Sequence, residues 1–177
     1  MKKILICLTV VFGLLAGSQH VDAQDLTGSE YKSAVGIRLG GGYYDVVAGS
    51  LKTFITKAGA IELNLGVRGD RGFGYNWVNL SVSGSYQHHF DIPAVDGLKW
   101  FIGGGLTAYN SFSKYDAYDG FGLSIFPTGG ADYKFENIPL NVSVDVRPSI
   151  QIVRPFDDIY NGFYIGNFGA AVRYTFR

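Results

Sequence analysis

Residues 163–177 read FYIGNFGAAVRYTFR. Every second position from Tyr164 to Phe176 carries an aromatic, aliphatic or glycine residue, while Arg173 and Thr175 fall on the opposite face. A period of two is typical of a β-strand with one apolar face. Ordinary strands have about 5–6 residues. A strand that crosses a bilayer within a β-barrel needs about 9–11 residues, with aromatic residues near the membrane surfaces. The stretch therefore predicts a membrane-spanning β-strand.

The first 23 residues have the features of a signal peptide. Two lysines precede a short apolar core at residues 4–16, and residues 21–23 (VDA) form an A-x-A-like cleavage site. Retention of this segment and a lipoprotein anchor are the alternatives, but the only cysteine, Cys7, lies inside the apolar core. We expect cleavage before Gln24, which leaves a periplasmic leader at residues 24–33.

The composition of the remaining chain favours one all-β domain. The sequence has 25 Gly, 12 Tyr and 13 Phe, and after residue 23 it has no apolar run of spanning-helix length. The full sequence has 15 basic and 15 acidic residues. Removal of residues 1–23 takes away Lys2, Lys3 and Asp22, so the remaining chain has a net charge of −1. Nucleic-acid-binding proteins carry a strongly basic surface, which a net charge of −1 does not indicate, so we expect no nucleic-acid partner.

Eight segments of the chain alternate apolar with small or polar residues. They lie at residues 34–43, 47–55, 60–68, 77–90, 99–108, 121–135, 140–152 and 163–177. The second, fourth and sixth connections are short, and the others, apart from the first, are longer and more polar. Outer-membrane barrels show this asymmetry, with short periplasmic turns and longer external loops. The pattern predicts an all-β fold, an eight-stranded antiparallel up-and-down transmembrane β-barrel over residues 34–177.

The contrast between the two faces indicates which side points inward. An apolar interior would have to hold Tyr86, Trp100 and Tyr174 beside many aliphatic side chains, although eight strands leave room for little more than one layer of side chains. The reverse arrangement, with small and polar residues inside and apolar residues toward lipid, fits a membrane barrel.

Charges on the predicted inward face must be paired, because an unpaired buried ion costs several kcal/mol. We predict that Glu62 and Asp145 face the three arginines of the inward face. Arg68 and Asp132 have two open interpretations, as lumen residues or as hydrated residues near the rims. The predicted lumen charge network consists of Arg38, Lys52, Glu62, Asp145, Arg147 and Arg173.

Several short motifs resemble a known family. They are AVGIRLG (34–40), Lys-x-Phe-x₅-Ala-x-Glu (52–62), YQHHF (86–90), WFIGGG (100–105), IPL (138–140) through RP (147–148), and VRYTF (172–176). Together they are similar to the small eight-stranded outer-membrane β-barrel proteins of Bacteroidetes-type bacteria, akin to OmpA- and OmpW-like barrels.

The resemblance implies a location in the outer membrane, with lipid and lipopolysaccharide as partners. It also implies insertion by the barrel-assembly machinery, which recognises a C-terminal strand that ends in an aromatic residue. Tyr174 and Phe176 are then the expected assembly signal, although Arg177 rather than an aromatic residue is last.

Few residues suggest catalysis or cofactor binding. His88 and His89 are adjacent, so a regular strand places them on opposite faces, where they cannot share one metal ion. They also lie at the predicted periplasmic end, whereas lipid-modifying barrel enzymes need a histidine near a serine at the external end. The glycine triplets 40–42 and 103–105 do not lead into a helix, which argues against phosphate loops. We expect no catalytic, cofactor-binding or metal-binding residues.

The predicted external loops leave two further interpretations open. Four acids there either bind a divalent cation or are simply solvated; these are Asp116, Asp119, Asp157 and Asp158. Four aromatic residues form either an adhesive loop or a girdle at the membrane interface; these are Tyr109, Phe112, Tyr115 and Tyr118.

Two functional classes are consistent with the sequence. One is a monomeric structural or interaction barrel with a plugged lumen and loops that face outside. The other is a small porin-like channel or a conduit for hydrophobic solutes. The inward charges, together with Phe54, Phe101 and Phe126, favour a plugged interior.

Overall fold

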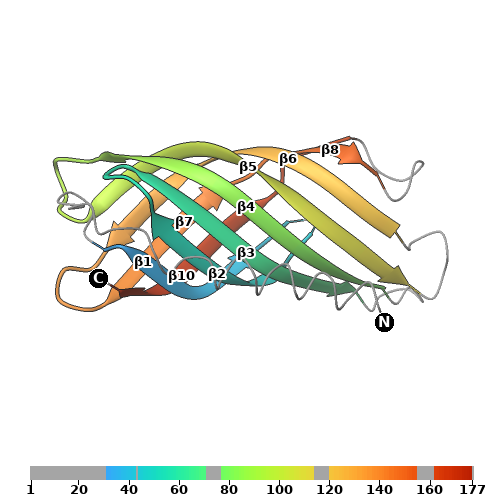
Figure 1. Cartoon of the computed structure of the whole chain (residues 1–177), viewed down its shortest axis with the longest axis horizontal. Coiled ribbons are helices and arrows are strands. Elements are labelled where there is room, and N and C mark those ends of the chain that lie inside the picture. Colours follow the sequence, from blue (N-terminus) through green and yellow to red (C-terminus); the bar gives the residue numbers. More distant parts are fainter. Residues whose placement is uncertain (1–30, 43, 71–76, 114–119, 155–161, 177) are drawn as a thin grey trace.

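The computed structural model describes residues 31–42, 44–70, 77–113, 120–154 and 162–176. Within these ranges the chain forms ten β-strands that close into one antiparallel barrel (Figure 1). No helix in the described ranges is long and apolar enough to cross a membrane. The strands are β1 (Ser33–Gly40), β2 (Val47–Phe54), β3 (Gly59–Asp70), β4 (Trp77–Asp91), β5 (Leu98–Ser113), β6 (Gly120–Lys134), β7 (Leu140–Val146), β8 (Ser149–Val153), β9 (Phe163–Tyr164) and β10 (Phe168–Phe176).

The wall of the barrel has eight parts. Strands β1 to β6 form six of these parts, and each pairs with the next in sequence. Strands β7 and β8 lie end to end and form the seventh part, and β9 and β10 form the eighth. Strand β10 pairs with β7 on one side and with β1 on the other, from Ser33 opposite Phe176 to Gly40 opposite Gly169, which closes the barrel. The predicted eight-stranded antiparallel barrel is confirmed.

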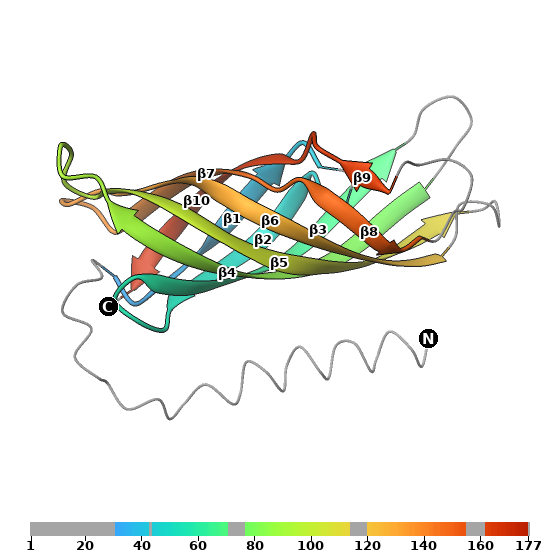
Figure 2. The ribbon, with the colours of Figure 1, turned by 90° about the horizontal axis from the view of Figure 1, so that it is seen from above.

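Two strands were predicted to be continuous, and this prediction is wrong. Both are interrupted, at the same level of the wall. The strand expected at 140–152 breaks at Arg147 and Pro148, and the strand expected at 163–177 breaks at residues 165–167 (Figure 2). Pro148 and Pro127, on the adjoining part of β6, have no N–H group to donate to a neighbouring strand. The Arg147 N–H instead donates to the Asn167 carbonyl at 2.8 Å, which links the two interrupted parts of the wall.

Two predicted boundaries also shift. The first strand ends at Gly40 rather than at residue 43. The fifth strand continues to Ser113, so that Tyr109 and Phe112, expected in a loop, belong to β5. The Tyr109 side chain is buried inside the barrel, where its ring centroid lies 4.5 Å from that of Tyr44. This inward packing extends the regular strand beyond the length that the sequence predicted.

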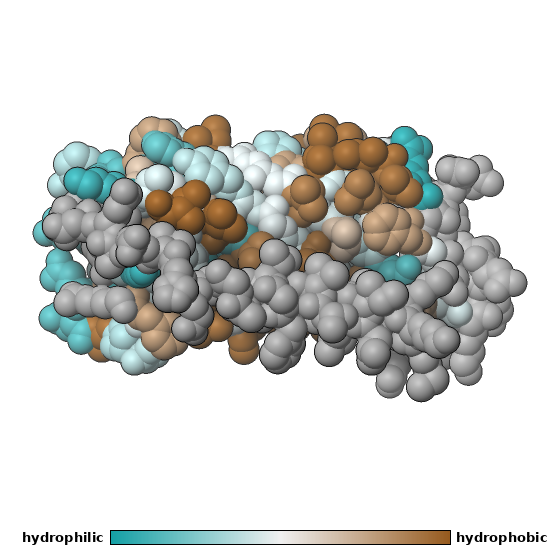
Figure 3. Space-filling model, viewed as in Figure 1, coloured by the Kyte–Doolittle hydropathy of each residue, from teal (hydrophilic) through white to brown (hydrophobic). Residues whose placement is uncertain are grey.

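The outward face is apolar along every long strand, and the inward face is small or polar. In β3, for example, Leu65 is 59 % exposed whereas the neighbouring Asn64 is 3 % exposed. The face seen in Figure 3 carries hydrophobic patches on either side of a paler centre, with hydrophilic residues mainly toward its ends. The core of the molecule is therefore the polar interior of the barrel.

The short connections lie at the same end of the barrel as the C-terminus (Figure 1). They are residues 55–58, 92–97 and 135–139. The described last residues of the expected leader, 31–33, also belong to this end, where Lys32 is exposed and Tyr31 is buried. Tyr31 is only 4 % exposed because its ring packs edge-on against Phe54, with centroids 5.1 Å apart. Residues 1–30, which include the expected signal peptide, lie outside the described residues.

Candidate functional site

The candidate site is the charged interior of the barrel, which strand alternation assembles from distant parts of the chain. Lys52 and Glu62 are paired neighbours on β2 and β3, and the other charged residues come from β1, β6, β7, β10 and the interruption after β7. Each charged residue of this group is at most 4 % exposed. The group, called the lumen network below, comprises Arg38, Lys52, Glu62, Asp132, Asp145, Arg147 and Arg173.

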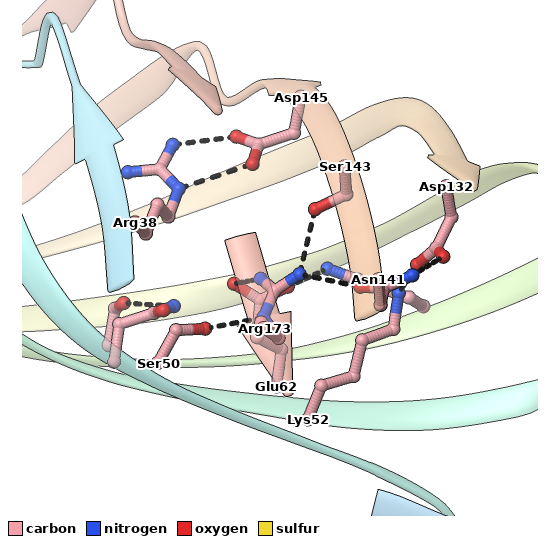
Figure 4. Close-up of polar contacts among 12 residues, drawn as sticks. Arg38, Ser50, Lys52, Glu62, Asp132, Asn141, Ser143, Asp145 and Arg173 are labelled. Carbon is pink, nitrogen blue, oxygen red and sulfur yellow. Dashed lines mark hydrogen bonds and ion pairs between the residues drawn. The ribbon is translucent and has the colours of Figure 1, made fainter. Parts of the chain in front are cut away.

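Glu62 lies at the centre of the lumen network (Figure 4). Its Oε1 atom is 2.8 Å from Arg147 Nη2 and 3.0 Å from Arg173 Nη2, while its Oε2 accepts a hydrogen bond from Gln87 Nε2 at 2.7 Å. Arg173 also donates to Ser50 and to Ser143. Both carboxylate oxygens are thus engaged, and one acid on β3 holds two arginines from the adjoining β7 and β10 parts of the wall.

Asp145 forms the second centre of the network. Arg38 donates to both of its oxygens, at 2.6 Å from Nη2 and at 3.2 Å from Nε, in the two-pronged geometry that makes arginine–carboxylate pairs strong. Arg147 Nε lies 2.8 Å from Asp145 Oδ1. Arg147 therefore bridges Asp145 and Glu62, which joins the two centres.

The position of Arg38 depends on a glycine in the neighbouring strand. Gly169 lies opposite Gly40 in the paired strands β1 and β10, and a Cβ atom added to it would overlap the Arg38 guanidinium. The absent side chain thus leaves the space that Arg38 occupies while it contacts Asp145.

Lys52 forms an ion pair with Asp132, a residue that the sequence left undecided between lumen and rim. The Asn141 side-chain amide donates to Asp132, and its carbonyl oxygen accepts from Arg173 Nη1 at 3.4 Å. Asn141 therefore connects the Lys52–Asp132 pair with the rest of the network. Strand alternation in the sequence already placed Asp132 on the inward face. Its partner, Lys52, is seen only in the structure, because the two residues lie on opposite walls of the barrel.

Aromatic side chains lie beside the Lys52–Asp132 pair, toward the C-terminal end of the barrel. The His89 ring lies between those of Phe54 and Phe101, at centroid distances of 4.9 and 5.2 Å, and its Nε2 is 3.6 Å from Asp132. Lys52 Nζ is 5.0 Å from the Phe101 centroid, within the range of a cation–π contact. Together with the buried Tyr31, these rings form what we call the aromatic stopper: Tyr31, Phe54, His89 and Phe101.

The balance of charge explains why the interior tolerates so many ions. Lys52 and the three arginines are matched by Glu62, Asp132, Asp145 and, at 3.6 Å from Arg38, Asp45. Paired and hydrogen-bonded charges avoid the cost of an isolated buried ion. The pairs also join residues far apart in sequence, as with Arg38 and Asp145, which are 107 positions apart. The arrangement ties opposite walls of the barrel together.

Other residues noted in the sequence lie outside the network. His88 points outward and contacts the Tyr86 hydroxyl at 3.3 Å, so the two histidines face opposite sides of the wall. Arg68 donates to the Gly42 carbonyl near the opposite end of the barrel, with its guanidinium 5.6 Å from the Trp77 ring centroid. The four loop acids fall outside the described residues, as do Tyr115 and Tyr118. In the described part of the chain, no group of three or more His, Cys, Asp or Glu residues is arranged to hold a metal ion.

Tyr174 and Phe176, the expected assembly signal, lie on the outward face of β10. Both are about half exposed, and their ring centroids are 5.0 Å apart. Arg177 lies outside the described residues.

Comparison with known proteins supports the fold alone. No family model matches the sequence, and no curated protein matches it. Among solved structures, the Neisserial surface protein A (NspA) superposes with a TM-score of 0.55 at 13 % sequence identity. The match covers 81 % of this chain and 94 % of that one. The chain and NspA therefore share a small closed β-barrel over almost the whole of the neighbour.

Proposed function

We propose that this protein is an integral outer-membrane β-barrel with a structural or interaction role, and that a charged network plugs its lumen. The observation that carries the proposal is the inverted polarity of the barrel, with aliphatic and aromatic side chains outside and ions inside. Soluble monomers rarely expose contiguous apolar patches beyond a few hundred Å². A hydrocarbon environment is the one in which such a surface has no cost.

Aromatic pairs at the C-terminal end of the barrel support the membrane position. Phe90 stacks on Trp100 with centroids 4.2 Å apart, and Tyr174 lies near Phe176 on the same outward surface. Outer-membrane barrels carry such aromatic girdles at the two membrane interfaces. The pairs therefore favour a membrane boundary close to the short turns.

The orientation follows from the connections and from the expected export signal. Short turns and the C-terminus at one end favour the periplasm there, which leaves the opposite end facing outside. Lipid and lipopolysaccharide are then the surrounding partners, and Tyr174 and Phe176 are the signal for the barrel-assembly machinery. A closed barrel has no free strand edge to pair with a second copy, which favours a monomer.

The plugged lumen is the basis for preferring a structural or interaction role over transport. The lumen network crosses the interior, and the aromatic stopper lies beside it toward the periplasmic end. The alternative, a small porin-like channel or a conduit for hydrophobic solutes, draws support from inward hydroxyl groups on β4 to β6. These are Ser81, Ser83, Ser85, Thr107, Ser111, Ser124 and Thr128.

Expression of the full chain in a Gram-negative host tests the proposed location. We expect the mature protein in the outer-membrane fraction, with a β-rich circular dichroism spectrum and a gel mobility that changes on heating. A folded protein in the soluble periplasmic fraction would contradict the proposal. The plugged lumen is tested separately, by conductance.

A further inference from the structure

His89 is a titratable side chain at the centre of the aromatic stopper. It is 4 % exposed, and its ring lies between those of Phe54 on β2 and Phe101 on β5. Tyr31 packs against Phe54 and completes the stopper. Histidine is the side chain whose charge ordinarily changes between about pH 5 and 8. A change of charge on His89 would therefore act directly on the packing of these rings.

The two ring nitrogens of His89 have different surroundings. Nδ1 lies 3.2 Å from the Ala58 carbonyl oxygen, in the turn between β2 and β3, which accepts the single N–H of a neutral ring. Nε2 has no hydrogen-bond partner among the described residues, and Asp132 Oδ2 lies 3.6 Å from it. Buried polar atoms are nearly always hydrogen-bonded, so such an exception is a candidate functional atom. A neutral His89 therefore presents Nε2 as a free proton acceptor inside the stopper.

The surroundings of Nε2 do not supply a free counterion for a protonated ring. Lys52 of β2 already forms an ion pair with the same oxygen of Asp132, and Asn141 donates to the other oxygen. The cations of the lumen network are already matched by acids, so a protonated His89 would add an unmatched positive charge beside the Lys52 ammonium. An ion buried among apolar rings without a counterion of its own is strongly unfavourable.

We propose that the aromatic stopper is a pH-sensitive switch: it is closed while His89 is neutral and opens to water when His89 takes up a proton. Opening here means that the rings of the stopper separate and water reaches His89 and solvates its charge. Because the open state binds one more proton than the closed state, opening becomes more favourable as the pH falls. The inference rests on the plugged barrel of the proposed function, to which it adds a regulated end.

Ala60 provides a position at which opening can be measured. It is fully buried in one packed cluster with Tyr31, Ala34 and Phe54. The only cysteine of the sequence, Cys7, lies in the expected signal peptide, so Ala60→Cys would give the refolded mature chain a single thiol within the stopper.

The test measures how fast a small water-soluble thiol reagent labels Ala60→Cys in detergent micelles. Each rate is divided by that of Lys57→Cys, on an exposed turn, which removes the pH dependence of the thiol chemistry itself. An exposed imidazole titrates near pH ~6.5, so uptake of one proton favours opening about tenfold more at about pH 5.5 than at about pH 7.5. We expect the normalised rate of Ala60→Cys to rise by about this factor.

Two further substitutions identify the group that binds the proton. Combined with His89→Gln, which stays neutral, the normalised rate of Ala60→Cys should not rise on acidification. Combined with His88→Gln, it should rise as before, because His88 faces outward and contacts the Tyr86 hydroxyl. An equal rise with His89→Gln would overturn the proposal, as would a rate that stays constant or falls on acidification without it.

Amide hydrogen exchange keeps the proposal testable if Ala60→Cys does not fold. The Phe54 N–H donates to the Lys32 carbonyl at 2.9 Å, which ties the stopper to the segment that carries Tyr31. Its exchange, corrected for the intrinsic effect of pH, should become faster on acidification in the wild type and not in His89→Gln. If the wild type shows no heat-dependent mobility, the proposed function fails, whereas a folded barrel with pH-independent labelling and exchange contradicts only the switch.

Discussion

Glu62 is the residue on which the interior depends most, because two arginines and Gln87 share its carboxylate. Glu62→Gln keeps the size of the side chain but leaves Arg147 and Arg173 without this counterion. Removing one partner from a buried ion pair costs about 3–5 kcal/mol. We expect a loss of that size in the free energy of unfolding, measured by urea titration of the protein in lipid vesicles. Glu136→Gln, on an exposed turn, is the control and should change stability by less than about 0.5 kcal/mol.

The adjacent histidines offer a matched pair of variants. His89 lies between two phenylalanine rings and near Asp132, so His89→Ala removes packing from the aromatic stopper. We expect it to lower the free energy of unfolding by about 1–3 kcal/mol. His88→Ala, on the outward face, should change it by about 0.5 kcal/mol or less. Equal losses in the two variants would contradict the assignment of the two side chains to opposite faces.

At this scale the sequence predicts the face of a residue better than its partner. Alternation places Glu62 and Asp145 on the inward side, and the structure brings both into contact with arginines. The Lys52–Asp132 pair was not assigned in the same way, because the sequence left Asp132 open between the lumen and the rim; the structure joins the two residues across the barrel.

The elements show where sequence patterns stop being sufficient. Eight alternating segments predict eight parts of the wall, because a period of two depends only on neighbouring residues. The interruptions at Pro148 and at residues 165–167 depend on pairing between strands. Pro148 was a visible signal, since proline within a strand marks an edge or an irregularity. Gly166 in the break of the last strand was a weaker signal, because glycine is common throughout this sequence.

A single methyl group tests how closely β1 and β10 pack around Arg38. Gly169→Ala places a Cβ atom in the space of the Arg38 guanidinium and should displace it from Asp145. We expect a loss of about 1–3 kcal/mol in the free energy of unfolding, as in other overpacked sites. Gly49→Ala, where the added carbon meets nothing within 4 Å, should cause no loss. Unchanged stability in Gly169→Ala would show that the wall yields to the added carbon.

The whole molecule combines an apolar exterior with an interior that holds paired ions and aromatic rings. In the proposed function, the exterior places the barrel in a membrane, and the plugged interior assigns its activity to the surfaces rather than to transport. The apolar exterior and polar interior were predictable, because the narrow space inside eight strands cannot hold the large apolar side chains. The contacts between side chains of opposite walls, on which the proposed closure of the lumen rests, could not be predicted from the sequence.

Single-channel conductance of the refolded protein in a planar bilayer tests the central claim most directly, with Glu62→Ala measured beside the wild type. The proposed plug predicts no discrete openings in the wild type, because the lumen network and the aromatic stopper would then leave ions no continuous path. It predicts leak currents in Glu62→Ala, where Arg147 and Arg173 lose their shared acid. Steady, discrete openings in the wild type would contradict the plugged interior and favour the channel.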